Sequence, residues 1–463
     1  MASNPRRVPP WIVLAILTAT ASTSIAPAAA DEASGELAEQ IDQVFARFDK
    51  PDSPGCAVAV MRQGQVIHKR GYGIANLDYG ILIASDSVFY LASVSKQFTA
   101  ACIALLVQEG KLSLDDPLSK FFPEFPEYDG GPITVRHLVH HTSGLRDYLT
   151  LMSLGRRRFE DVTSVDEVLE LITRHQELNF APGEKYLYSN SGYFLLSEIV
   201  RRAAGKSMRE YAREKIFEPL GMKNTRFHDD RSEIVKNRVI SYMPQGDGYQ
   251  ISYLANFDQV GSGGLLSTVD DLVLWVRNFE SNQIGGDGFL PLMKTRGKLN
   301  DGSELDYAFG LSHGQYKGLT TLGHGGAMMG FRTHLVGFPD QRAAVIVLAN
   351  LGTANPAELA EQVADVVLAE AIGESLKRYA GRYTSDELDV TYEIAAEGTD
   401  LVLKHTREVP GKLAPLDDAH AFSLPGTGIE LHFTADDAGQ ITACRVGSGR
   451  AQNIRFAKDD VSP

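Results

Sequence analysis

The stretch Ser93-Val94-Ser95-Lys96 sets a hydroxyl and an amine three residues apart, at the predicted start of a helix. Positions i and i+3 of a helix share one face, so the Ser93 oxygen and the Lys96 nitrogen come within reach of each other. Residues 98–106, which follow, are free of charge, and a helix that is apolar all round is a buried one. Burial lowers the pKa of a lysine, so the pair has the chemistry of a nucleophile with its activator.

Taken alone, Ser-x-x-Lys is a weak motif, because short motifs of common residues arise by chance. The alternative is a surface lysine at a helix start, with a serine that acts only as a cap. Two further stretches, in a set order, argue against that alternative. Tyr188 and Asn190 lie two apart in a predicted loop before an amphipathic helix, and Leu322-Gly323-His324-Gly325-Gly326-Ala327 precedes strand-like runs at 333–338 and 343–348.

In these three motifs the chain resembles the superfamily of serine β-lactamases and penicillin-binding proteins. The branch it resembles holds class C β-lactamases, D-alanyl-D-alanine carboxypeptidases, D-aminopeptidases and related esterases. Lesser signatures at 138–145 and 263–268 extend the resemblance over most of residues 35–370. It implies an α/β fold, in which an antiparallel sheet is flanked by helices and faced by a helical lobe over 110–255. The sheet should include a hairpin over 57–71 that turns at Gln63-Gly64.

The same resemblance implies a role for each motif residue. Ser93 is the implied acylated nucleophile, and Lys96 is its hydrogen-bonded activator. Tyr188 is the implied general base or proton relay, and Asn190 is implied to hold a substrate carbonyl or the lysine. The remaining residues are implied to form the strand beside the substrate, with the backbone N–H groups of Ser93 and Ala327 as the oxyanion hole: His324, Gly325, Gly326 and Ala327.

The chemistry gives its own reasons for these residue types. A phenol, with an ordinary pKa of about 10, accepts a proton near neutral pH only if a cation stabilises its phenolate. Lys96 is the candidate cation for Tyr188. Glycine at 325 and 326 is expected to let an extended substrate backbone approach the strand without meeting a Cβ.

One departure from the family pattern bears on the substrate. Many β-lactamases and carboxypeptidases carry Lys-Thr-Gly where this chain has His324-Gly325-Gly326, so the fixed cation and the hydroxyl that help to bind a substrate carboxylate are both missing. Some carboxypeptidases of the superfamily also have histidine at the first position. Arg332 is a further candidate for binding a carboxylate, although charged residues are mostly solvated ones.

We therefore expect a serine hydrolase that forms an acyl-enzyme on Ser93. Its expected substrates are D-amino-acid-containing peptides or amides, or small esters. A β-lactamase or a D-alanyl-D-alanine carboxypeptidase is the first alternative. The second is a protein without catalytic activity that binds peptidoglycan fragments. The sequence leaves open the natural substrate, the stereospecificity and the oligomeric state.

Other site types find little support in the sequence. His137, His140 and His141 lie close together, but no further ligand falls at a zinc spacing such as His-Glu-x-x-His. No Gly-x-Ser-x-Gly elbow of an α/β-hydrolase occurs. We expect no metal and no nucleotide cofactor. A formal net charge of -14 also disfavours nucleic acid as a partner.

The first thirty residues predict export. Arg6-Arg7, an apolar run from residue 11 and Ala28-Ala29-Ala30 form a signal peptide, with cleavage expected before Asp31. The apolar run is too short to span a bilayer comfortably, and the residue directly after the expected cleavage site is Asp31 and not a cysteine that could carry a lipid. We expect a periplasmic or secreted enzyme without a stable membrane anchor.

The pattern changes near residue 373, where a predicted helix over 357–372 is closed by Gly373. We expect a hydrolase domain over 31–373 and a second domain over 379–463. The latter has about eight runs of period two separated by turn residues, which predicts a small closed antiparallel barrel. It resembles the lipocalin-like domain of some D-aminopeptidases. We expect its own side chains to fill it, and we expect it to pack against the catalytic cleft.

The chain has three cysteines, which in an oxidising compartment allow at most one disulfide. Cys56 lies in a strand-like run and Cys102 in the apolar helix, so burial as small hydrophobic residues is the default expectation for them. Any pairing with each other or with Cys444 is left open.

Overall fold

The structure is a computed structural model that describes Met1 and residues 35–459, except 253–257, 406–407, 417 and 419. The predicted signal peptide, residues 1–30, lies outside the described residues apart from Met1. Among the residues described, no helix has the length and apolar character needed to cross a membrane.

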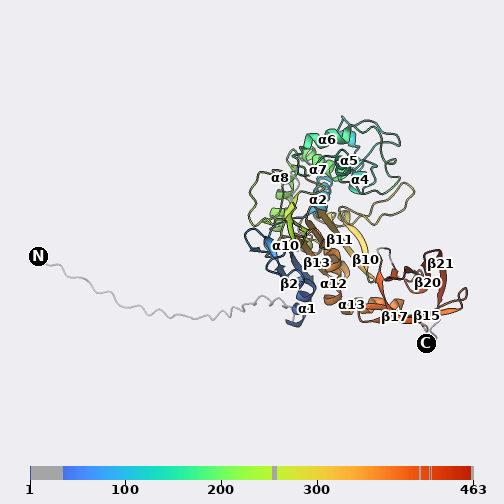
Figure 1. The fold of residues 1–463 in the computed structure, drawn as a ribbon. Coiled ribbons are helices and arrows are strands. Elements are labelled where there is room, and N and C mark those ends of the chain that lie inside the picture. The colour runs from blue at the N-terminus through green and yellow to red at the C-terminus, as the bar shows by residue number, and fades with distance from the viewer. Residues whose placement is uncertain (2–34, 253–257, 406–407, 417, 419, 460–463) are drawn as a thin grey trace.

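A six-stranded antiparallel sheet forms the centre of the hydrolase part, in the order β10-β11-β12-β13-β1-β2 (Figure 1). The predicted hairpin is confirmed as β1 and β2, with Gln63 and Gly64 at positive φ in the turn. The two strand-like runs of the sequence lie in β12 and β13. The strands are β1 (Cys56–Arg62), β2 (Gln65–Tyr72), β10 (Ser312–Tyr316), β11 (Leu319–Met328), β12 (Phe331–Phe338) and β13 (Ala343–Ala349).

Both faces of this sheet are buried, and each belongs to its own apolar cluster. Ala57 and Ala59 of β1 pack into the cluster that contains α2 (Ser95–Gln108). Val58 and Val60 alternate with them and pack against α1 (Gly35–Phe45) and α12 (Pro356–Val367). Successive side chains of a strand point to opposite faces. Alternate residues of β1 therefore face α2 on one side of the sheet and α12 on the other.

The helical lobe stands over the α2 side of the sheet (Figure 1). Its helices are α3 (Leu118–Phe121), α4 (Val135–Val139), α5 (Tyr148–Leu154), α6 (Val165–Thr173), α7 (Asn190–Ala204), α8 (Met208–Ala212) and α9 (Glu218–Leu220). Helices α10 (Val269–Ser281) and α11 (Phe289–Met293) return the chain to the sheet. Short strands brace the connections: β3 (Ile74–Asn76), β4 (Ile81–Leu82), β5 (Phe89–Tyr90), β6 (Arg226–Phe227), β7 (Tyr242–Gln245), β8 (Gly248–Ile251) and β9 (Leu265–Ser267).

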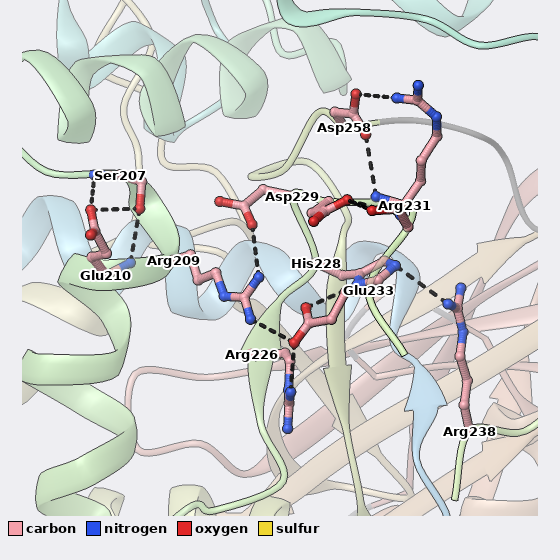
Figure 2. Close-up of polar contacts among 12 residues, drawn as sticks. Ser207, Arg209, Glu210, Arg226, His228, Asp229, Arg231, Glu233, Arg238 and Asp258 are labelled. Carbon is pink, nitrogen blue, oxygen red and sulfur yellow. Dashed lines mark hydrogen bonds and ion pairs between the residues drawn. The ribbon is translucent and has the colours of Figure 1, made fainter. Parts of the chain in front are cut away.

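A charged cluster at the base of the lobe ties residues 226–238 in place (Figure 2). Glu233 accepts hydrogen bonds from Arg209 at 2.8 Å and from Arg226 at 3.0 Å. The backbone N–H of His228 donates to the carbonyl of Gly264 at 2.7 Å. The cluster thereby supports the segment that leads into β9.

The predicted closed barrel is confirmed, with eight antiparallel strands. They are β14 (Gly381–Ser385), β15 (Val390–Glu397), β16 (Asp400–His405), β17 (Glu408–Pro415), β18 (Ala421–Leu424), β19 (Ile429–Ala435), β20 (Ile441–Ser448) and β21 (Ala451–Lys458). Buried side chains such as Tyr383, Phe433 and Phe456 occupy its interior. They belong to the same apolar cluster as α12, so the core continues from the sheet into the barrel.

The prediction that Gly373 ends the helix before the barrel is wrong. The helix breaks earlier, at Leu368, and Gly373 lies inside the next helix, α13 (Ala369–Leu376). A Cβ at position 373 would lie 3.1 Å from the carbonyl oxygen of Gly398, in the turn between β15 and β16. Glycine is therefore used for a close approach of α13 to the barrel and not as a stop.

The barrel meets the rest of the chain at α13 and at the turn between β10 and β11. Lys317 in that turn donates to Asp365 of α12 at 2.8 Å and lies 3.7 Å from Asp400 of the barrel. These contacts lie on the α12 side of the sheet. The expected packing of the barrel against the catalytic cleft is not tested by them and stays a prediction.

Candidate active site

Ser93, the candidate nucleophile of the sequence motif, lies on a tight turn. Ala92 to Val94 form a 3₁₀ turn, and α2 begins at Ser95. Ala92 has φ of +49°, a left-handed conformation that residues with a side chain adopt rarely. Strained backbone of this kind gathers at functional sites, where the surrounding structure imposes it. Here the turn carries the Ser93 side chain into a pocket and keeps Lys96 on the following helix.

The predicted approach of Ser93 and Lys96 is present. Nζ of Lys96 lies 3.2 Å from Oγ of Ser93 and donates to Oδ1 of Asn190 at 2.9 Å. A third hydrogen bond, of 2.7 Å, goes to the carbonyl oxygen of Ser262. Two distant segments, at Asn190 and at Ser262, thus meet the amine beside Ser93. Asn190 hydrogen-bonds the lysine, which is one of the two roles that the resemblance implies for it.

Lys96 is fully buried. Burial lowers the pKa of its ammonium to about 7, against the carboxylate of Asp147, which raises it. Desolvation dominates because a buried charge loses its hydration. Near neutral pH a large fraction of Lys96 is therefore a neutral amine, which is able to take the proton of Ser93.

Asp147 has a positioning role that the sequence reasoning missed. Its carboxylate accepts from the backbone N–H of Asn190 at 2.6 Å and from that of Thr150 at 2.9 Å. It therefore caps α5 and fixes the first residue of α7 together. An aspartate at a helix start is the only signal in the sequence, and it does not reveal the second contact.

Tyr188 lies beside the lysine, as the sequence predicts. The Nζ of Lys96 lies 4.7 Å from the centroid of its ring. Burial raises the pKa of the Tyr188 phenol, and a hydrogen bond with Ser93 opposes this shift only in part. The expected lowering of this pKa by a lysine cation is thus not found, because both groups are buried and burial disfavours both charged forms. The phenol stays protonated near neutral pH.

His324 is near this group but forms its hydrogen bonds elsewhere. Its Nε2 lies 3.0 Å from the hydroxyl of Tyr307, and its Nδ1 lies 2.5 Å from the carbonyl oxygen of Gly325. Burial lowers the pKa of its imidazole to about 3, and the nearby Lys96 contributes in the same direction. His324 is therefore neutral, and it does not replace the lysine cation of the Lys-Thr-Gly pattern.

Gly325 and Gly326 differ in what their missing side chains allow. A Cβ at Gly326 would lie 2.4 Å from the carbonyl oxygen of Leu91 and 3.1 Å from the backbone nitrogen of Ser93. A Cβ at Gly325 would meet only ordinary contacts, the nearest at 3.4 Å. Gly326 thus lets β11 pack against the nucleophile turn itself, a reason that the sequence reasoning, which considered only the substrate, did not supply.

A pocket opens at Ser93, and several of the predicted site residues line it. Ser93, Asn190 and Ala327 line it together with Tyr148 and Gln259. Ala327 is exposed and pairs with Arg332 across β11 and β12. The Arg332 guanidinium donates to the carbonyl oxygens of Met329 and Phe331, each at 2.8 Å, so its charge is engaged by its own turn.

Gln259 is a second residue of the pocket that belongs to none of the sequence motifs. Its Nε2 donates to the carbonyl of Thr163 at 2.6 Å, which fixes the orientation of the amide. Its Oε1 is buried and has no hydrogen-bond partner in the described part of the chain. Gln259 therefore lines the pocket of Ser93 with one end of its amide engaged and the other buried without a partner.

The three histidines considered as a metal cluster have separate structural roles. His137 completes the capping box of α4, whose N-cap is Thr134, and its ring accepts from the backbone N–H of Thr134 at 3.2 Å. His140 hydrogen-bonds the carbonyl of Thr295 at 3.3 Å. His141 accepts from the backbone N–H of Ser189 at 3.2 Å and packs against the Tyr188 ring, with centroids 4.3 Å apart. The last of these supports the loop that carries the phenol.

Sequence comparison agrees with the geometry. The family model described as Beta-lactamase matches residues 41–369. A D-aminopeptidase of Gluconobacter oxydans (strain 621H) is 29% identical over 351 residues, 74% of this chain and 63% of that protein. A D-aminopeptidase of Brucella canis is 30% identical over 309 residues, 66% of this chain and 58% of that protein. The matched part of the chain thus spans less than two thirds of these relatives.

Solved structures show the same fold at lower identity. The octameric penicillin-binding protein homologue from Pyrococcus abyssi aligns with a TM-score of 0.63 at 24% identity, over 92% of this chain and 99% of that one. The D-amino acid amidase from Ochrobactrum anthropi SV3, in complex with D-phenylalanine, aligns with a TM-score of 0.61 at 23% identity, over 72% and 99%. Both likenesses concern the fold alone.

Proposed function

The chain belongs to the Beta-lactamase family of serine hydrolases, and on this premise we propose that it cleaves amide or ester bonds through an acyl-enzyme on Ser93. D-amino-acid amides and peptides are the proposed main substrates, with small esters as further ones. The observation that carries the proposal is the position of the buried Lys96. Its amine, with a pKa of about 7, lies next to the Ser93 hydroxyl.

Acylation begins as Oγ of Ser93 attacks the substrate carbonyl carbon while its proton passes to the neutral Nζ of Lys96. The carbonyl oxygen takes up the electron pair, and the backbone N–H groups of Ser93 and Ala327 bind the resulting oxyanion. Donors of this kind typically contribute about 3–4 kcal/mol to the transition state. Asn190 and the Ser262 carbonyl keep the amine in place during the transfer.

Collapse of the tetrahedral intermediate breaks the bond to the leaving amine or alcohol. The Tyr188 hydroxyl gives its proton to the leaving group and takes one from the Lys96 ammonium. This relay suits a phenol whose pKa burial has raised, since the hydroxyl is protonated when it is needed. Water then attacks the acyl-enzyme by the same steps in reverse order, which releases the acid and restores the Ser93 hydroxyl.

The neutral His324 and the free Oε1 of Gln259 support the choice of substrate. Because β11 has no fixed cation, a substrate carboxylate beside the scissile bond gains little binding energy there. A substrate with an amide or a free amine at this place loses no binding energy. We propose that the Gln259 oxygen, which is buried in the free protein, accepts from an N–H of such a substrate after the side chains of the pocket move to uncover it. Two relatives at about 30% identity bear the name D-aminopeptidase, which is consistent with this substrate class.

Intact-mass detection of acyl adducts across D- and L-aminoacyl amides, small esters and β-lactams tests the proposal. We expect adducts with D-amino-acid amides or esters, none in Ser93→Ala, and adducts retained in Ser95→Ala. Ser95 is the matched control, because its buried hydroxyl bonds to the Ala92 carbonyl and lies outside the pocket. Adducts with β-lactams alone would identify a β-lactamase. If fluorophosphonate and all substrates leave folded protein unlabelled, the chain is a binding protein.

A further inference from the structure

A second pocket opens at the base of the helical lobe. It has a volume of about 480 Å³ and is lined by residues of α8, of the π-helical turn Arg213–Phe217, of α9 and of β6. It shares no lining residue with the pocket of Ser93. Binding sites for small molecules typically have volumes of about 300–1,000 Å³. The pocket therefore has room for an organic molecule of several atoms and not only for a single ion.

The lining of this pocket is basic, although the chain has a formal net charge of -14. Among the lining residues only Glu218 is acidic, whereas four carry a positive charge: Arg209, Arg213, Lys223 and Arg226. A cleft lined by charges of one sign concentrates ligands of the opposite sign. The charge of the wall therefore favours an anionic ligand.

Two of the arginines are held in place by carboxylates (Figure 2). Arg209 donates to Asp229 at 3.2 Å and to Glu233 at 2.8 Å. Arg226 donates to the same Glu233 at 3.0 Å, and the other end of its guanidinium points away from Glu233 (Figure 2). Both side chains remain partly exposed, at 31% and 32%. Because a guanidinium has five N–H donors, each arginine keeps donors for a ligand and loses little side-chain freedom on binding it.

The other two cations are exposed and less engaged. The Arg213 guanidinium lies 3.6 Å from the carboxylate of Glu218, beyond hydrogen-bond distance. Lys223 forms no ion pair within the described ranges. The carboxylates of Glu218, Asp229 and Glu233 thus balance three of the four positive charges of the pocket. An excess positive charge and several unused N–H donors remain for a ligand.

We propose that this pocket is a binding site for a phosphate monoester, separate from the pocket of Ser93. Phosphate oxygens accept from Arg209 and Arg226, which the carboxylates hold in place. Arg213 and Lys223 approach the same group from the exposed side. A phosphate monoester suits this arrangement because it has three acceptor oxygens and a charge of about -1.5 to -2 at neutral pH, and because guanidinium groups bind such oxygens in pairs. The site does not depend on the reaction proposed for Ser93.

Isothermal titration calorimetry of the protein with glycerol 3-phosphate, glycerate and glycerol compares ligands that share a three-carbon skeleton and differ in charge. We expect glycerol 3-phosphate to bind at least about tenfold tighter than glycerate, because it forms additional charge-assisted hydrogen bonds. Glycerol should not bind. The affinity for glycerol 3-phosphate should fall as salt is added, because salt screens exposed charges. Co-sedimentation with phosphatidylcholine vesicles, with and without phosphatidic acid, presents the same phosphate group on a lipid.

Two sets of variants assign the binding to this pocket. Arg226→Gln should weaken binding of glycerol 3-phosphate at least about tenfold. Arg231→Gln is the matched control and should bind like the wild type, because Arg231 pairs with Asp258 and does not line the pocket. The double variant Arg213→Gln/Lys223→Gln changes only exposed side chains. It therefore tests the site even if Arg226→Gln fails to fold, and it should weaken binding about fivefold or more.

Binding of the soluble ester identifies a small-molecule site. Binding of phosphatidic acid vesicles alone, lost in the double variant, identifies a lipid headgroup as the source of the same group. Binding of neither at millimolar phosphate, equal affinity for glycerate and glycerol 3-phosphate, or unchanged affinity in the double variant would overturn the proposal.

Discussion

Nζ of Lys96 lies 4.7 Å from the ring centroid of Tyr188, so the two proposed proton carriers of the site are packed against each other. Burial acts on them in opposite directions. It lowers the pKa of the amine to about 7 and raises that of the phenol. At neutral pH the pair is therefore an available base beside an available acid, which are the two forms that the proposed acyl transfer to Ser93 requires.

The pH dependence follows from the lysine. Lys96 must be neutral to accept the Ser93 proton, so kcat/KM should rise tenfold per pH unit below about 7 and level off above it. In Lys96→Arg the side chain stays charged, so kcat/KM should be about 10²–10⁴-fold lower than in the wild type at every pH. Stopped-flow or steady-state assays of D-phenylalanine amide from pH 5 to 9 measure this. An acid limb near pH 4 would instead point to a carboxylate.

The free oxygen of Gln259 predicts a preference for substrates with an N–H or ammonium next to the acyl group. Gln259→Met should lower kcat/KM for D-phenylalanine amide by about tenfold relative to 3-phenylpropanamide, which lacks the amino group. Loss of the Thr163 contact affects both substrates alike, so the ratio isolates recognition. An unchanged ratio would remove Gln259 from this role, while turnover of neither substrate by the wild type would instead reject the proposed function.

The two glycines of β11 should respond differently to a methyl group. Gly326→Ala drives a Cβ into the Leu91 carbonyl and toward Ser93, and should cost about 1–3 kcal/mol of unfolding free energy along with most of the activity. Gly325→Ala is the matched control, since its nearest contact is 3.4 Å away, and it should change stability by less than about 0.5 kcal/mol. Urea unfolding compares them. Similar losses in both would show that the turn is not the constraint.

Lys317 should stabilise the attachment of the barrel. Its buried ammonium joins Asp365 of α12 to Asp400 of the barrel. Lys317→Met should therefore lower the free energy of unfolding by about 1–3 kcal/mol. The loss is smaller than for a fully buried ion pair because both carboxylates are partly exposed. Lys412→Met removes an exposed partner of the same Asp400 and should cost less than about 0.5 kcal/mol. Thermal unfolding at low salt measures both. Equal effects would mean that burial of Lys317 adds nothing.

The sequence predicted which of the candidate residues lie together better than it predicted their pKa values. Ser93, Lys96, Tyr188 and Asn190 belong to motifs whose types and order are readable, and they lie together in the structure. The pKa of the phenol was not predictable, because it depends on how deeply two groups from distant segments are buried. Gln259 was missed for a similar reason, since its partner is a backbone carbonyl at residue 163.

The fold was predictable where pattern and local signal agree. The eight barrel strands have period-two sequences separated by turn residues, and the hairpin of β1 and β2 has a strand-like apolar run followed by a turn at Gln63-Gly64; both are present. The prediction at Gly373 was wrong because a glycine after a helical run is compatible with two structures, a helix end or a close contact with another segment. Only the approach of the β15–β16 turn, at 3.1 Å from a Cβ at that position, decides between a helix stop and a close contact.

The pairing of β1 with β13 has a consequence for how the chain reaches this state. β1 is among the first strands to be synthesised, and the neighbour that completes it lies near residue 345, beyond the whole helical lobe. Until that neighbour arrives, the nascent hairpin carries an unpaired apolar edge, the kind of surface that templates aggregation. Chaperones that shield extended apolar segments should therefore improve its yield more than those that act late.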